Sequence, residues 1–113
     1  MPTPHAWLMA FLATVAVEGP IVVVLTRGHP TPAWRRALIA IFAQLVTHPL
    51  VWFVFPRLVG LTGRSSLALS ELWAWLAEAA FYAVVLPGLS PARALGISAL
   101  ANAASIMVGL AIF

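Results

Sequence analysis

Four long runs of apolar residues divide the chain, and only a few polar positions interrupt each run. The runs cover residues 6–26, 37–55, 67–86 and 94–113. At a rise of about 1.5 Å per residue, a helix over any of them can cross the hydrocarbon part of a bilayer. The pattern therefore predicts an all-α, polytopic membrane protein. Residues 1–113 would form a single domain, a bundle of four transmembrane helices with short loops.

Hydroxyl residues followed by proline mark three expected helix starts, because Ser or Thr caps a helix well and proline suits its first position. These starts are Thr3-Pro4, Thr31-Pro32 and Ser90-Pro91. The third run lacks this pair, and its expected cap is Ser65 or Ser66, after a glycine-containing turn at 60–63.

Polar and small residues recur three or four positions apart within each run, which places them on one face of a helix. The first run contributes Thr14 and Glu18, the second Gln44, Thr47 and His48, the third Glu71, Trp75, Glu78 and Tyr82, and the fourth Ala94, Ser98, Asn102, Ser105 and Gly109. Lipid tails offer no hydrogen-bond partners, so we expect these faces to meet inside the bundle.

Four of these polar residues lie near the midpoints of their runs, namely Glu18, His48, Glu78 and Asn102, so we expect them to share one layer near the bilayer centre. An ionised carboxylate there costs roughly 2.5 to 3.5 kcal/mol, so it must face the bundle interior, find a partner or carry a proton. The sequence thus predicts a buried polar network, or a proton or ligand site, formed by Glu18, His48, Glu78, Asn102, Gln44, Thr47, Tyr82 and Ser105.

Two interpretations of Glu18 and Glu78 are open: proton or cation handling, and hydrogen bonding between helices by a protonated carboxyl group. For His48 we expect a pair with Glu18. Asn102, with Ser98 and Ser105, is typical of hydrogen bonds that join helices.

Pro20 and Pro49 each remove a backbone N–H inside a run, which predicts kinks close to these groups. Glu71 lies nearer the start of its helix and is expected to be solvated at the interface. Trp52 is expected to anchor the chain at the membrane interface, and only Trp75 and Tyr82 are expected to line a pocket.

Composition supports the membrane assignment, because 63% of residues are hydrophobic and 8% are charged. The six basic residues are all Arg and lie in short loops, so the high pI reflects membrane topology and we expect no nucleic-acid partner. The chain has no Cys and no clustered metal donors, and its one deep histidine, His48, cannot supply two haem ligands. We expect no cofactor, no metal and no enzymatic activity.

The positions of the arginines suggest an orientation. The first and third connections carry Arg27, Arg35, Arg36 and Arg93, whereas the second carries Arg57 and Arg64. This bias favours a multi-pass protein of a bacterial-type cytoplasmic (inner) membrane with both termini outside. The positive amino terminus opposes the bias, so inverted and dual topologies are open alternatives.

The chain length, four helices and a carboxylate in the first helix, Glu18, resemble the small multidrug resistance transporters, which work as proton-coupled dimers. The resemblance is one of architecture, because Glu18-Gly19-Pro20 is not that family's local pattern, and His48 and Glu78 have no counterpart in it. Architecture alone implies little about function.

Four short helices enclose little volume, so we expect a homo-oligomer or association with other membrane subunits. Our first hypothesis is a structural or accessory subunit of such a complex, with the buried network fixing helix packing. The alternative is a small proton- or cation-coupled transporter or channel that works as an oligomer.

Overall fold

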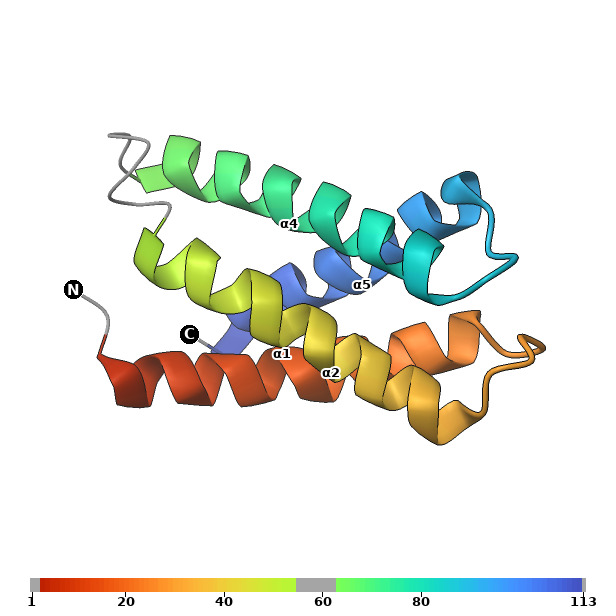
Figure 1. Cartoon of the computed structure of the whole chain (residues 1–113). Coiled ribbons are helices and arrows are strands. Elements are labelled where there is room, and N and C mark those ends of the chain that lie inside the picture. The colour runs from red at the N-terminus through yellow and green to blue at the C-terminus, as the bar shows by residue number, and fades with distance from the viewer. Residues whose placement is uncertain (1–2, 55–62, 113) are drawn as a thin grey trace.

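The computed structural model describes residues 3–54 and 63–112, with side chains from residue 68 onward in the second range. These ranges contain the helices α1 (Pro4–Leu25), α2 (Ala33–Pro49), α4 (Gly63–Val85) and α5 (Pro91–Ile112), and a π-helical segment, η1 (Leu50–Val54), extends α2. The helices stand side by side as a bundle (Figure 1), and within the described ranges four stretches are long and apolar enough to span a membrane. The predicted all-α, four-helix membrane fold is confirmed.

Each helix of the bundle packs against two others. α1 contacts α2 and α5, and α4 contacts α5 and, over a smaller area, α2. Figure 1 shows both termini at one end of the bundle, which we call the terminal end. The loops α1–α2 (26–32) and α4–α5 (86–90) lie at the other end, the loop end.

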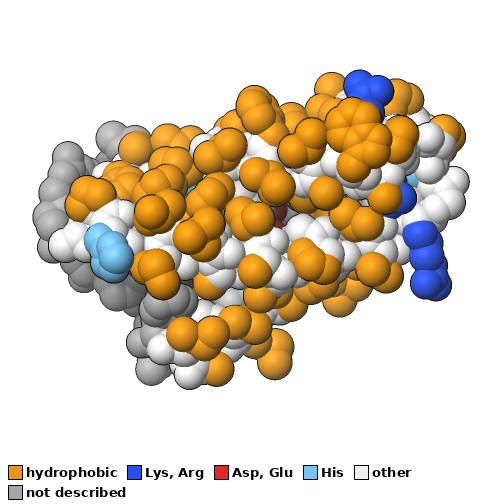
Figure 2. Space-filling view, turned by 90° about the horizontal axis from the view of Figure 1, so that it is seen from below, with side chains coloured by type: hydrophobic (Ala, Val, Ile, Leu, Met, Phe, Trp, Pro, Cys, Tyr) orange, Lys and Arg blue, Asp and Glu red, His pale blue; other side chains and the backbone are white. Residues whose placement is uncertain are grey.

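The dimensions and surface of the bundle suit a bilayer. Its extents are 42 × 23 × 20 Å, so the long axis covers a hydrocarbon core of about 30 Å together with part of the headgroup regions. Figure 2 shows a flank covered by hydrophobic side chains, with Arg side chains at one end.

The helix starts agree only partly with the predicted caps. The Oγ1 atom of Thr3 accepts a 3.0 Å hydrogen bond from the Ala6 N–H, and Ser90 Oγ accepts one of 3.2 Å from the Arg93 N–H. The prediction for Thr31 is wrong, because α2 begins at Ala33 with Pro32 as its uncapped N-cap residue.

The expected cap for the third run is also wrong. Because α4 begins at Gly63, Ser65 and Ser66 lie inside its first turn and cannot cap it. The rest of the predicted turn at 60–63, like Arg57, lies outside the described residues.

Arg36, counted in the sequence as a loop charge, is buried beneath the loop end. Its Nη1 donates to Val23 O and to Thr26 Oγ1 (2.7 Å), and its Nε donates to Thr31 O (2.9 Å). The last carbonyls of an α-helix have no backbone partners within that helix. The guanidinium of Arg36 supplies a donor to one of them, the carbonyl of Val23.

The two internal prolines act differently. α1 continues as an α-helix through Pro20, whereas α2 changes to the π-helical η1 directly after Pro49. Pro49 cannot donate to the carbonyl of Leu45, and π-helical turns commonly form where the α-helical hydrogen-bond ladder is interrupted. The sequence predicts the interruption at Pro49 but not the π geometry that follows.

The interior changes character along the bundle. The apolar core lies in the loop half and comprises Val22, Ala40, Ala43, Tyr82, Leu86, Leu89, Ala94, Ile97 and Ala101. At this end the two loops are joined by a 2.8 Å hydrogen bond from His29 Nε2 to Pro87 O. The start of α5 is joined to the end of α1 by a 3.2 Å bond from Arg93 Nη2 to Leu25 O. Polar side chains occupy the middle, and a cavity lies in the terminal half.

Candidate functional site

Glu18 of α1 and Glu78 of α4 face each other in the middle of the bundle, and both are almost completely buried. Gln44 of α2 lies between them. Its Nε2 donates a 2.8 Å hydrogen bond to Glu18 Oε1 and one of 3.0 Å to Glu78 Oε1. One amide therefore holds both carboxyl groups close together.

Glu78 collects further donors from its neighbours. Thr47 Oγ1 donates to Glu78 Oε2 at 2.9 Å, and Asn102 Nδ2 donates to Glu78 Oε1 at 3.2 Å. Asn102 Nδ2 also donates to Ser98 O on its own helix at 2.8 Å. We call Glu18, Gln44, Thr47, Glu78 and Asn102 the carboxyl cluster, and it joins all four helices.

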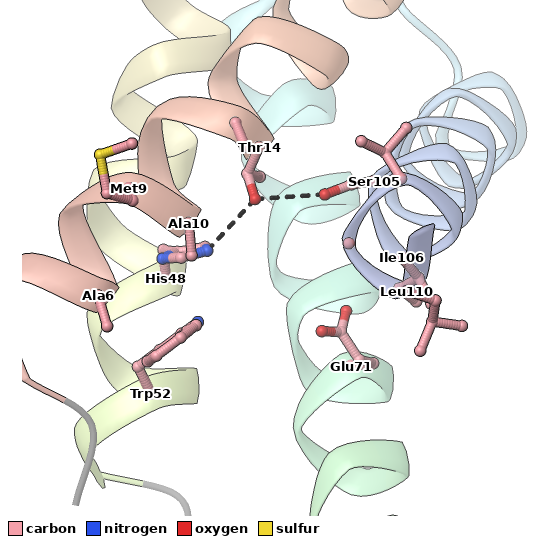
Figure 3. Close-up of a pocket in the computed structure, with 13 residues that line it drawn as sticks. Ala6, Met9, Ala10, Thr14, His48, Trp52, Glu71, Ser105, Ile106 and Leu110 are labelled. Carbon is pink, nitrogen blue, oxygen red and sulfur yellow. Dashed lines mark hydrogen bonds between the residues drawn. The ribbon is translucent and has the colours of Figure 1, made fainter. Parts of the chain in front are cut away.

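The expectation that His48 shares the layer of Glu18 and Glu78 is wrong, because it lies in a second polar layer one helical turn nearer the terminal end. His48 Nε2 hydrogen-bonds Thr14 Oγ1 at 3.4 Å, and Ser105 Oγ donates to Thr14 Oγ1 at 3.3 Å. Figure 3 shows these three side chains in a row across α2, α1 and α5.

The expected pair of His48 with Glu18 does not form, because α1 and α2 are antiparallel. A step of four residues forward along α2, from Gln44 to His48, matches a step of four back along α1, from Glu18 to Thr14. Gln44 therefore faces Glu18, and His48 faces Thr14.

Aromatic rings enclose His48. The ring centroids of Phe11, Trp52 and Trp7 lie 5.7, 6.0 and 6.3 Å from that of the imidazole. Its Nδ1 atom is buried and has no hydrogen-bond partner in the described part of the chain. His48 thus lies beside the cavity with one buried ring nitrogen that is unpaired among the described residues.

A cavity of about 430 Å³ occupies the terminal half of the bundle. Exposed side chains, among them Met9 and Leu110, form its rim. Its inner wall carries Thr14, His48, Trp52, Glu71 and Ser105 (Figure 3).

A smaller polar cavity of about 50 Å³ lies between that wall and the carboxyl cluster. It is lined by the same inner-wall residues together with all five members of the cluster. A water molecule needs about 30 Å³, so this space can hold one or two waters between polar groups. A route of polar contacts therefore leads from the outer cavity to Glu18 and Glu78.

Two residues of the inner wall were assigned elsewhere from the sequence. Glu71, expected at the interface, is half-buried and lines both cavities, as does Trp52, the expected anchor. Both residues lie away from the midpoints of their helices, so an argument based on midpoints does not select them. A signal was present, since Trp52 follows His48 by four residues and Glu71 precedes Glu78 by seven.

The expected pocket residues Trp75 and Tyr82 lie away from both cavities. Trp75 Nε1 donates to Leu95 O at 2.9 Å. Tyr82 is fully buried in the apolar core, and its hydroxyl has no partner among the described residues, so its expected place in the polar network is wrong.

The carboxyl cluster brings two ionisable carboxyl groups together inside the apolar bundle. Among the described arginines, Arg36 and Arg93 make hydrogen bonds to carbonyl and hydroxyl oxygens at the loop end. These bonds do not neutralise the carboxyl cluster. Two full charges side by side in the membrane interior are far more costly than one, so the pair suits a shared proton. Within the described ranges no group of His, Cys, Asp or Glu is arranged to hold a metal ion.

Comparisons of the chain with protein families, curated proteins and solved structures found no match. The geometry of the carboxyl cluster and its cavity therefore carries the functional argument.

Proposed function

We propose that the protein is a proton-coupled membrane transporter that works as an oligomer in a bacterial-type cytoplasmic membrane. The observation that supports this proposal is the outer cavity, whose inner wall leads through a small polar space to the paired carboxyl groups of Glu18 and Glu78. Acidic residues inside membranes commonly mark proton or ion pathways.

The two ends of the interior differ, which suits transport by alternating access. The terminal half contains the outer cavity, whose described rim is exposed, whereas the loop half is filled by the apolar core and bridged by the His29–Pro87 contact. The carboxyl pair would then exchange protons through the outer cavity and not across the apolar core. A small, mostly apolar solute suits the outer cavity, because alanine and aliphatic side chains form much of its wall.

Proton flux into liposomes tests this proposal. The protein is reconstituted with a pH-sensitive dye inside and with small apolar solutes on both sides, because a coupled transporter moves protons only together with its solute. Protons are driven inward by a pH gradient and a potassium diffusion potential. We expect wild-type liposomes to acidify faster than protein-free ones, and Glu78→Gln to reduce the rate to the protein-free level, because an amide cannot release a proton.

Tyr82→Phe is the matched control, because Tyr82 is equally buried in α4 but its hydroxyl contacts neither cavity. It should leave the flux unchanged. Wild-type liposomes that acidify no faster than protein-free ones would refute the transport proposal.

The second candidate is the structural or accessory subunit. It is favoured by the completeness of the hydrogen bonding around Glu78, which accepts from Gln44, Thr47 and Asn102 and so ties α4 to α2 and α5. Purification in mild detergent followed by mass analysis would then reveal stoichiometric subunits. Glu78→Gln would leave that assembly intact, since an amide oxygen still accepts hydrogen bonds.

A further inference from the structure

A groove of about 560 Å³ runs along the outside of the bundle between α2 and α4, away from the carboxyl cluster. Leu38 and Phe42 form its α2 wall, and Phe81 and Val85 form its α4 wall. The rings of Phe42 and Phe81 stack with centroids 5.8 Å apart at its inner end. The groove is therefore an apolar trough.

Positive charge lies at the loop end of this trough. Arg35 lines it, is exposed, and has no hydrogen bond or ion pair in the described part of the chain. A neighbouring pocket of about 430 Å³ between the two loops is lined by Arg27 and Arg93 and shares Pro87 with the groove. The three glutamates all line the cavity in the middle of the bundle, so they do not offset this charge.

The depths of the charged and apolar residues along the groove match the change from headgroup region to hydrocarbon in a membrane. Trp34 is 65% exposed beside Arg35, and exposed Trp side chains favour the headgroup region. Phe42 follows Trp34 by two helical turns, which places it about 12 Å deeper. The trough thus begins at the interface and extends into the hydrocarbon.

We propose that this groove is a specific site for an anionic phospholipid. One acyl chain lies along Leu38, Phe42, Phe81 and Val85, the phosphate meets Arg35, and the headgroup points toward the loop pocket. A free phosphate ion would leave the apolar trough unused. A second copy of the chain in the same orientation, packed symmetrically, would bring its own Arg35 to the same depth, where the two positive charges repel each other.

Competitive lipid binding to the full chain tests the site. The protein in mild detergent is mixed with equal amounts of phosphatidylglycerol and phosphatidylcholine that carry the same acyl chains, and bound lipid is counted by native mass spectrometry. We expect phosphatidylglycerol to be preferred, and Arg35→Gln to reduce the preference about fivefold, the usual effect of one arginine near an anionic surface. Arg35→Lys should retain most of it.

A matched pair of variants tests the trough itself. Val85→Trp fills the groove and should reduce the binding of phosphatidylglycerol, whereas Val84→Trp, at the adjacent position that is 80% exposed and does not line the groove, should not. Circular dichroism checks that both variants remain helical. Equal binding of the two lipids to the wild type, or an unchanged preference in Arg35→Gln, would overturn the proposal. So would a protein dimer that Val85→Trp disrupts, because the occupant would then be a second copy.

Discussion

Gln44 holds the two central carboxyl groups with the hydrogens of a single amide. Its side chain is almost completely buried, so no bulk solvent can replace it. Buried acceptors that lose a donor are costly, and hydrogen bonds between transmembrane helices are individually modest. The stability of the carboxyl cluster should therefore depend more on Gln44 than on any other donor in it.

Gln44→Leu should lower the free energy of unfolding by about 1 to 3 kcal/mol, because it leaves acceptors on both Glu18 and Glu78 without their shared donor. Thermal or denaturant unfolding in detergent, followed by circular dichroism, measures this loss. Tyr82→Phe should change stability by less than about 0.5 kcal/mol, because it removes a buried hydroxyl that has no partner among the described residues. An equal loss in both variants would contradict this account of the cluster.

The sequence predicts which residues face the interior, but not their partners. Spacings of three and four place Glu18, Gln44 and Glu78 on inward faces, and the structure buries all three. The pairing of His48 with Thr14 depends on how far the antiparallel helices α1 and α2 are shifted along each other. Packing between helices sets that shift, and no pattern within one helix records it.

At the scale of the elements, the start of each helix depends on local contacts that a sequence motif only approximates. Ser90-Pro91 and Thr31-Pro32 both consist of a hydroxyl residue followed by proline. Of these two hydroxyl residues, only Ser90 caps its helix. Around Thr31, the Thr31 N–H donates to His29 Nδ1, and Thr31 O accepts from the buried Arg36. Contacts with other parts of the loop end thus determine the conformation there, and the motif does not.

Ser90→Ala should cost about 1 kcal/mol of stability, the usual value for a lost N-cap hydroxyl. Thr31→Ala should cost clearly less, because its hydroxyl does not cap α2. The same unfolding measurement compares the two variants in one detergent. If Thr31→Ala proves as destabilising as Ser90→Ala, the start of α2 at Ala33 is in doubt.

At the scale of the whole molecule, the described interior is divided into an apolar half at the loop end, a polar middle and a half that contains the outer cavity. Four apolar runs predict the bundle, and the midpoints of the runs predict where polar groups gather. The outer cavity could not be predicted, because it results from the packing of α1, α5 and the π-helical η1 around His48 and Trp52. The outer cavity also forms within one chain, although four short helices are expected to enclose little volume.

The excess of arginines at the loop end, four against the two of the second connection, predicts the orientation of the bundle in the membrane. Arg27, Arg35 and Arg93 are exposed at the loop end, and positively charged loops stay on the cytoplasmic side. The outer cavity would then face outward, together with both termini. Because the chain has no cysteine, single cysteines can report each end in intact cells.

His5→Cys, exposed at the terminal end, should react with a membrane-impermeant maleimide added outside. Ala92→Cys, exposed at the loop end, should react only after the membrane is permeabilised. The reverse pattern would place the cavity on the cytoplasmic side, and a transporter in this state would then take protons from the cytoplasm. Labelling of both positions at half yield would indicate a dual topology, in which oppositely oriented copies expose their cavities on both sides of the membrane.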